Sequence, residues 1–455
     1  MAAARQGEES GRRPPPFAAA AATTYGAQLL AAALSFVSVL IVSRALGPSG
    51  RGDVAFLITV AVLSSNFALL GVQEANANFA ASDPSQRSAL ATNSLLLSGL
   101  TGGGCVALLV VLLAAIPSFG PSVAGWLVAL ALGSVVLLVL QTQLQFLIAA
   151  EYGFGSYNLS LLIPPFVNVT VNGFLAAIGE LGVGAAYVTW VSGQVLATLL
   201  VLWIVARRLA GFGRPDAALA RRALMFGFKA HLGRLMMFAN YRIDQWFVGA
   251  ISGSRELGLY SIAVAWSEVL FYLPTALVVV QRPYLVRAAP RDAARRAAVV
   301  FRAGLVLTAL LTGAVLIAAP FLCERVFGPD FRGATDDLRV LALGAFGIVA
   351  VKQLGNALTA QRRPGLASLA AGVTLVVTVA LDIALIPPHG GLGAALASTI
   401  SYTAGGLAAA FFFVRVFRAP PSGLIPRATE LPFVVRELAR SFRSRPGGAI
   451  KPAGD

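Results

Sequence analysis

The chain has 455 residues, of which 57% are hydrophobic and only 12% are charged, and its formal net charge is +15. A soluble domain usually carries about 25% charged residues, so this composition excludes a water-soluble globule and makes lipid the natural solvent. The basic charge does not indicate nucleic-acid binding, because it is concentrated in short segments between long apolar stretches.

Twelve apolar stretches are long enough to cross a hydrocarbon core of about 30 Å as helices. They are continuous rather than alternating, which favours helices over β-strands. The predicted spans are 22–46, 53–77, 90–115, 122–149, 156–178, 183–207, 226–250, 257–281, 298–322, 337–360, 366–387 and 392–417. We therefore predict an all-α integral membrane protein.

The loops between these spans differ in their content of Lys and Arg. If the N-terminus is cytoplasmic, the inside segments carry 23 of these residues, whereas the outside loops carry four, at Arg51, Arg255, Arg325 and Arg332. This asymmetry follows the positive-inside rule, and it predicts that both termini are cytoplasmic. The excess basic charge then contacts anionic lipid rather than DNA.

The second half of the chain repeats features of the first. Gly52 opens the sequence GDVAF, and Gly258 opens GLYSI 206 residues later; GVGAA at 182–186 corresponds to GLGAA at 391–395, 209 residues later. A near-constant offset predicts duplication, although chance similarity between apolar segments is the alternative. Duplication predicts two six-helix lobes related by a pseudo-two-fold repeat around a central cavity.

The predicted organisation has five parts. It consists of a cytoplasmic N-terminal tail (1–21), an N-lobe (22–207), a cytoplasmic linker (208–225), a C-lobe (226–417) and a basic cytoplasmic tail (418–455). The N-terminal tail has no short apolar core with a cleavage site, so it does not resemble a cleaved signal peptide. Within the other tail, 429–443 has apolar residues at helical spacing opposite arginines, which predicts an amphipathic helix on the membrane surface; a disordered tail is the alternative.

No motif in the chain indicates covalent chemistry. There is no P-loop pattern, and Cys105, Cys323, His231 and His389 form neither a disulfide framework nor a metal-binding spacing. A membrane polymerase or ligase would need acid, base or metal groups on a sizeable external loop, whereas 323–336 is short and has no His. We predict a protein that is not an enzyme and has no cofactor.

The two halves differ in their intramembrane polar residues. The first half offers amides, among them Gln28 and Gln141, which suit sugar hydroxyls; hydrogen bonding between helices is the alternative. Charges inside a bilayer cost about 2.5–3.5 kcal/mol on insertion scales, and nearly all of them lie in the second half. Those we assign to a pyrophosphate headgroup site are Arg234, Arg242, Glu268 and Lys352.

Ion pairing of Glu268 with Arg234 or Lys352 is the alternative to that headgroup site. A second group of residues lies at a common depth in spans 7, 11 and 12, roughly 8–9 Å below the outer edge at 1.5 Å per residue. It consists of Asp244, Asp382 and Ser398, with Thr378 one turn deeper than Asp382 on the same helix face. These oxygen ligands suit sodium at Asp244 and Asp382, or a proton on one carboxylate; pairing of Asp244 with a nearby arginine is the alternative.

Four segments carry a family resemblance. They are LGPSGRG at 46–52, NYRID at 240–244 followed by ELGLYS at 256–261, FGPDF at 327–331 with LRVLA at 338–342, and IPP at 386–388 with GLGAALA at 391–397. In this order and at these spans they resemble bacterial O-antigen and capsule type polysaccharide flippases. That family belongs to the multidrug/oligosaccharidyl-lipid/polysaccharide exporter superfamily.

The resemblance covers 22–417 and implies alternating access around a central cavity. It implies that undecaprenyl-pyrophosphate-linked oligosaccharide is flipped from the inner to the outer leaflet of the plasma membrane, alongside a polysaccharide polymerase and glycosyltransferases. It also implies antiport with Na⁺ or H⁺. The related lipid II flippases bind sodium with acidic residues in spans 7 and 11 and a hydroxyl in span 12, which Asp244, Asp382 and Ser398 match.

Two departures separate the chain from the lipid II flippases. Thr378 stands where those proteins place an amide, and span 1 lacks their inner arginine. These departures weigh against lipid II as cargo. A multidrug exporter of the same superfamily is the other alternative, but its cavity should be acidic or aromatic to accept cations, whereas Arg234 and Lys352 are basic.

Overall fold

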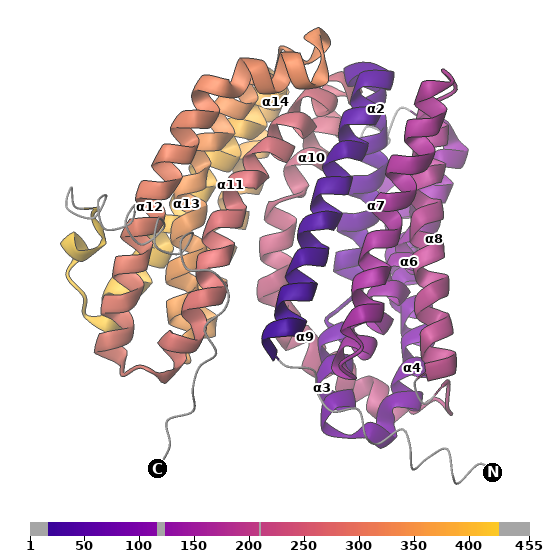
Figure 1. Cartoon of the computed structure of the whole chain (residues 1–455), viewed down its shortest axis with the longest axis horizontal. Helices are drawn as coiled ribbons and strands as arrows, with labels where there is room; N and C mark the ends of the chain where they lie inside the picture. Colours follow the sequence, from indigo (N-terminus) through magenta and orange to yellow (C-terminus); the bar gives the residue numbers. More distant parts are fainter. Residues whose placement is uncertain (1–16, 116–122, 209–210, 427–455) are drawn as a thin grey trace. The chain divides into compact units, whose positions relative to one another are not determined.

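The computed structural model describes residues 17–115, 123–208 and 211–426, and all the regular elements in these ranges are helical (Figure 1). The predicted amphipathic helix at 429–443 lies outside the described residues. The first seven long helices are α2 (Phe17–Ala68), α3 (Val72–Ser82), α4 (Arg87–Leu97), α5 (Gly103–Ala115), α6 (Gly125–Ala150), α7 (Phe154–Ala177) and α8 (Val183–Arg208). The later helices are α9 (Ala217–Asn240), α10 (Ile243–Phe247), α11 (Ser254–Arg287), α12 (Pro290–Pro320), α13 (Ala334–Ala360) and α14 (Pro364–Phe417).

Short helical turns join or extend these helices. Those with π-helical geometry are η3 (Ser98–Gly102), η5 (Val248–Ser252) and η6 (Phe321–Arg325). Those with 3₁₀ geometry are η2 (Pro84–Gln86), η7 (Pro329–Phe331) and η8 (Pro421–Leu424). A π-helical turn inserts an extra residue into a helix and is often found at functional sites.

Eight helical segments of the described chain are long and apolar enough to cross a membrane. Helix α14 contains predicted spans 11 and 12, which are separated by a kink at Gly390. Helix α2 contains span 1 and most of span 2, which are separated by a kink at Gly47, and the rest of span 2 lies in α3. Gly47 and Gly390 adopt positive φ angles of 65° and 55°, which other residues rarely adopt. Predicted spans 7 and 8, in α9 to α11, are not among the eight.

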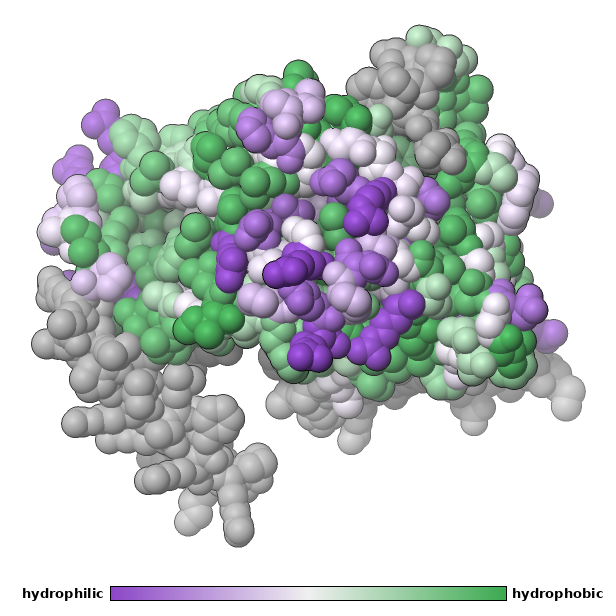
Figure 2. Space-filling model, turned by 90° about the horizontal axis from the view of Figure 1, so that it is seen from above, coloured by the Kyte–Doolittle hydropathy of each residue, from purple (hydrophilic) through white to green (hydrophobic). Residues whose placement is uncertain are grey.

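Large apolar side chains cover the outside of these helices, as lipid contact requires. Ile317 is 85% exposed and Val376 is 70% exposed, for example. Figure 2 shows hydrophobic residues around the sides and hydrophilic residues gathered on the end that is seen from above. The chain is therefore a multi-pass membrane protein.

The helices form two compact units. Unit 1 comprises Met1–Ala265, Pro320–Leu338 and Thr378–Ala397, and unit 2 comprises Trp266–Ala319, Arg339–Val377 and Ser398–Asp455. Unit 1 thus contains the predicted N-lobe together with span 7 and the first part of span 8. In addition, α9 begins at Ala217, inside the predicted linker, because the Asp216 side chain caps it by accepting a hydrogen bond from the Leu219 N–H at 2.9 Å.

The two repeat turns meet within unit 1 in a contact that we call the glycine seam, formed by Pro48, Gly52, Ser254 and Gly258. Gly52 lies against the carbonyl oxygen of Ser254, and Gly258 lies against the carbonyl oxygen of Pro48. A methyl group on either glycine would overlap that oxygen. Since Ser254 and Gly258 follow Pro48 and Gly52 by 206 residues each, the contact is reciprocal, as a pseudo-two-fold axis requires.

Candidate functional site

Predicted span 7 is a broken helix. Helix α9 ends at Asn240, and Arg242 has φ −134° and ψ −20°, which is not helical. The chain resumes in α10, passes through the π-helical turn η5, and turns at Gly253 with φ 87° before α11. A break at membrane depth frees backbone groups and is tolerated where it lines a cavity or packs on protein. The sequence NYRID therefore lies at the irregular point of the span.

The break brings five polar residues of unit 1 together, which we call the carboxylate cluster: Asn240, Asp244, Tyr260, Thr378 and Asp382. Each of them is at most 2% exposed. The Tyr260 hydroxyl donates to Asp244 Oδ2 at 2.5 Å, and the Gln245 N–H donates to Asp244 Oδ1 at 2.7 Å. The Thr378 hydroxyl donates to Asn240 Oδ1 at 2.5 Å.

Asp382 differs from Asp244 in its hydrogen bonding. Among the described residues, neither carboxyl oxygen of Asp382 has a hydrogen-bond partner, and neither does Asn240 Nδ2. The carboxyls of Asp382 and Asp244 are close enough for their charges to interact. A buried, unpaired carboxylate costs several kcal/mol or more, so it takes up a proton or a cation. The orphaned oxygens of Asp382 therefore fit a hard cation or a proton.

The sequence prediction named three of these residues and missed two. Asn240 supplies an amide against Thr378, at the point where the resemblance implied an amide in span 11. Tyr260 was quoted only as part of a motif, and its place one turn into α11, near Asp244, was not visible in the sequence. Among the described residues no three His, Cys, Asp or Glu side chains come together as a metal site.

Ser398 is fully buried in α14 beyond the Gly390 kink, and it belongs to unit 2. Its backbone oxygen accepts a hydrogen bond from the Ser401 hydroxyl at 2.9 Å. Its membership of the ion-coupling group remains a prediction.

Arg234 has a carboxylate partner that the sequence analysis did not anticipate. Its guanidinium lies 2.7 Å from Glu74 of α3 and 5.6 Å from the centre of the Phe146 ring of α6. The Arg234 side chain is 52% exposed, so the pair faces an open region of unit 1. Glu74 is the single acidic residue of α3, and that isolated charge inside predicted span 2 was the signal in the sequence.

Arg242, the second basic candidate in unit 1, is the residue that begins α10. Its guanidinium donates to the Tyr241 carbonyl at 3.4 Å, and it lies close enough to Arg51 for their positive charges to interact. Two like charges at this depth attract an anionic group.

Lys352 and Glu268 both lie in unit 2. The Lys352 ammonium donates to the Thr275 hydroxyl at 2.7 Å and to the Phe271 carbonyl at 3.4 Å, and it lies 5.8 Å from the centre of the Phe271 ring. Glu268 is close enough to interact electrostatically with this ammonium. The predicted basic headgroup residues are thus divided between the two units.

The two amide candidates are placed differently. Gln28 is exposed near the start of α2. Gln141 is buried between α6 and α8, where its Oε1 accepts a hydrogen bond from the Thr198 hydroxyl at 3.4 Å. The structure therefore gives Gln141 the role of an interhelical contact and leaves only Gln28 open to a ligand.

The described geometry defines a multi-pass helical membrane protein with a broken, charged span beside buried carboxyls. Solved structures with this fold include the lipid II flippase MurJ in an inward closed conformation, with a TM-score of 0.68, 14% identity and 92% coverage of both chains. An inward-facing multidrug resistance MATE family transporter of the MOP superfamily has a TM-score of 0.64 and 14% identity over 85% of this chain and 94% of that one. A MOP superfamily transporter from Pyrococcus furiosus has a TM-score of 0.58 and 13% identity over 87% and 93%.

Residues 18–289 match the family described as "Polysaccharide biosynthesis protein". The chain belongs to this family. No curated protein sequence matches it. Its fold is also shared with these solved flippase and transporter structures.

Proposed function

We propose that this chain is a secondary transporter that flips undecaprenyl-pyrophosphate-linked oligosaccharide from the inner to the outer leaflet of the plasma membrane. The family match over 18–289 carries the class of cargo. Alternating access would move the cargo without covalent chemistry, and both termini would be cytoplasmic, as the distribution of Lys and Arg predicts.

The basic residues supply the headgroup site in this proposal. Arg234 and Arg242 of unit 1 would contact the pyrophosphate, and a role for Lys352 in the headgroup site stays a prediction from the sequence. Arg234 would exchange its bond with Glu74 for a phosphate oxygen, since a guanidinium forms charge-assisted pairs with both anions. The released Glu74 carboxylate can then accept hydrogen bonds from sugar hydroxyls.

Cation coupling is the second part of the proposal. Asp382 and Asp244 would bind Na⁺ or H⁺, with oxygens of Asn240 and Thr378 nearby, and Ser398 would complete the group. A cation that binds one conformation more tightly shifts the population toward it, so cation binding would bias the equilibrium between the inward-facing and outward-facing states. The support is the orphaned carboxyl of Asp382 next to a second carboxyl.

The test of the cargo is the double replacement of Arg234 and Lys352 by Ala in cells that depend on this chain. We expect loss of surface polysaccharide and accumulation of lipid-linked sugar in the cytoplasmic leaflet, with normal amounts of protein in the membrane. The charge-matched control replaces Arg221 and Arg222, which are exposed at the start of α9, by Ala. Normal surface polysaccharide in the Arg234 and Lys352 double variant would refute the headgroup site.

A lipid II flippase is the second candidate, because the MurJ fold matches over 92% of the chain. The contact between Thr378 and Asn240 supplies the amide that the sequence of span 11 lacks. To distinguish the two cargoes, this chain is expressed in a cell that lacks its own lipid II flippase, and the growth of that cell is measured. Growth would establish lipid II as a cargo, and failure to grow, with polysaccharide export intact, would support the oligosaccharide.

A further inference from the structure

The glycine seam is surrounded by contacts between the first repeat and the start of the second. Asp53 and Ser254 are hydrogen-bonded through their side chains, and the Thr59 hydroxyl donates to Gln245 Oε1 at 3.4 Å. The rings of Phe56 and Trp246 meet edge to face at 6.4 Å. These contacts hold the start of α11 and all of α10 against α2.

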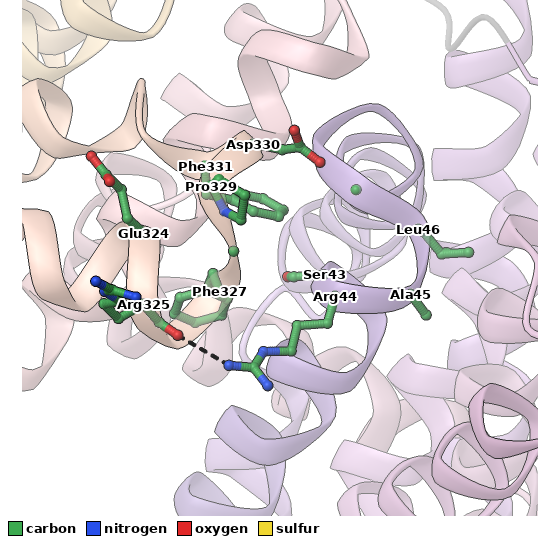
Figure 3. A pocket seen from close by; sticks show the side chains of 12 residues that line it. Ser43, Arg44, Ala45, Leu46, Glu324, Arg325, Phe327, Pro329, Asp330 and Phe331 are labelled. Atoms are coloured by element: carbon green, nitrogen blue, oxygen red, sulfur yellow. Dashed lines mark hydrogen bonds between the residues drawn. The ribbon is translucent and has the colours of Figure 1, made fainter.

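A polar groove of about 740 Å³ lies at the same end of unit 1, between 43–47 of α2 and 324–331 (Figure 3). Arg44 crosses it and donates to the carbonyls of Arg325 at 3.0 Å and Val326 at 2.8 Å. The distribution of Lys and Arg predicts that this end faces away from the cytoplasm. Such contacts must separate for an alternating-access protein to open toward that side.

Tyr260 joins the seam to the carboxylate cluster. It lies two residues after Gly258, within the first two turns of α11, and its hydroxyl donates to Asp244 Oδ2 at 2.5 Å. The neighbour of Asp244, Gln245, is bonded to α2 through Thr59. A hydrogen bond to a charged carboxylate is about twice as strong as one to a neutral acceptor. Neutralising Asp244 therefore weakens the attachment of α11 to α10.

We infer that Tyr260 is a positioning residue that couples Na⁺ binding in the carboxylate cluster to the opening of the glycine seam. The inference rests on the proposed cation coupling. When no Na⁺ is bound, the hydrogen bond from Tyr260 to Asp244 holds α11 in the closed seam. When Na⁺ is bound between Asp244 and Asp382, it competes for the Asp244 oxygen, the bond to Tyr260 weakens, and Gly258 is released from the carbonyl of Pro48.

The experiment measures the seam directly in the full chain. Ser49 and Arg255 are exposed, they flank the seam, and they are 206 residues apart, so they are equivalent positions of the two repeats. Cysteines at these two positions carry spin labels, and the native Cys105 and Cys323 are replaced by Ala. The distance between the labels is recorded in lipid nanodiscs while the Na⁺ concentration is varied at constant pH and constant ionic strength.

In the parent protein we expect a longer distance to become populated as the Na⁺ concentration rises. Tyr260→Phe should move the half-maximal cation concentration by about tenfold or more, the effect of losing a hydrogen bond to a charged group. Tyr187→Phe is the matched control, because Tyr187 is a fully buried tyrosine of the N-lobe with a hydroxyl 3.4 Å from that of Ser134. It should shift the midpoint less than twofold.

The outcomes are distinguishable. A midpoint in Tyr260→Phe that equals the parent's within twofold overturns the coupling role of Tyr260 and leaves cation coupling intact. If the parent distance does not respond to Na⁺, both the role of Tyr260 and the proposed coupling to Na⁺ fail. Transport of lipid-linked sugar is then judged separately by the Arg234 and Lys352 variants.

Discussion

The two repeat turns are alike in shape and different in chemistry. In the first repeat, the part of α2 before the non-helical Gly47 is a continuous helix, whereas in the second repeat the corresponding span is broken at Tyr241 and Arg242. The positions equivalent to Asp244 and Tyr260, 206 residues earlier, are Ser38 and Val54. Both repeats therefore contribute backbone to the glycine seam. Only the second repeat has a carboxylate, Asp244, and a phenol, Tyr260, at these equivalent positions.

This difference separates two requirements. The symmetric glycine seam needs only the absence of side chains, so both repeats could keep it. Ion binding needs charged groups at membrane depth, which are costly, and one copy of them is sufficient. The following predictions test this division, from the largest expected effect to the smallest.

Gly52→Ala and Gly258→Ala should each prevent closure of the seam, and they should do so equally, because each methyl group would overlap a backbone carbonyl that cannot rotate away. We expect loss of most transport and a longer distance between labels at Ser49 and Arg255. Gly133→Ala is the control, since that helical position in α6 has open space around it. Very different effects of the two seam variants would contradict the symmetry.

Asp382→Asn should abolish the dependence of transport on cations while leaving the protein folded in the membrane. The amide keeps the size of the side chain but cannot carry the charge that binds Na⁺ or H⁺. Transport is compared with and without a Na⁺ or pH gradient in proteoliposomes. Normal gradient-dependent transport would remove Asp382 from the coupling site. Val54, in the other repeat, provides a control: Val54→Ile should preserve the gradient dependence.

Glu151→Gln should have a small effect on stability that depends on pH. Glu151 lies in the loop between α6 and α7, where partial burial raises its pKa above the usual 4.5, and the nearby Arg87 partly offsets this shift. A raised pKa favours the protonated folded state, so this group's contribution to stability is largest at low pH and falls as pH rises past 4.5.

The Gln variant should therefore lose this pH dependence, with a change of less than about 1 kcal/mol because the ion pair is partly exposed. Thermal unfolding midpoints of the purified protein at several pH values measure it. The same pH profile in both proteins would contradict the shifted pKa of Glu151.

Much of the architecture was predictable because the bilayer imposes it. Long apolar runs have to become helices, since backbone groups cannot be left unpaired in lipid. The positions of the spans in α5 to α8 and α12 to α14 follow from this rule. The break of predicted span 7 at Tyr241 and Arg242 was not predicted, because the local sequence there has neither Pro nor Gly.

The candidate site was predictable in its carboxylates and not in their partners. Asp244, Asp382 and Thr378 were found because polar residues at one helical depth are conspicuous in an apolar sequence. Asn240, Tyr260 and Glu74 were missed, since depth along a helix does not say which way a side chain points or which helix lies opposite. Gln141 shows the same limit of depth as a guide. Its depth suits contact with a ligand, but its side chain accepts a hydrogen bond from Thr198 of a neighbouring helix.

The sequence by itself determined that the chain is a bundle of membrane helices with repeated glycine turns and charges concentrated in its second half. Hydrophobic length and the cost of buried charge act on each residue locally, so they can be read along the chain. Only the tertiary structure decided that the two turns interlock, that Tyr260 reaches Asp244, and that Asp382 has no partner among the described residues. The interlocking of the turns and the surroundings of Asp382 depend on packing between segments more than 100 residues apart. The contact of Tyr260 with Asp244 spans only 16 residues, but it depends on the break in span 7, which no local rule encodes.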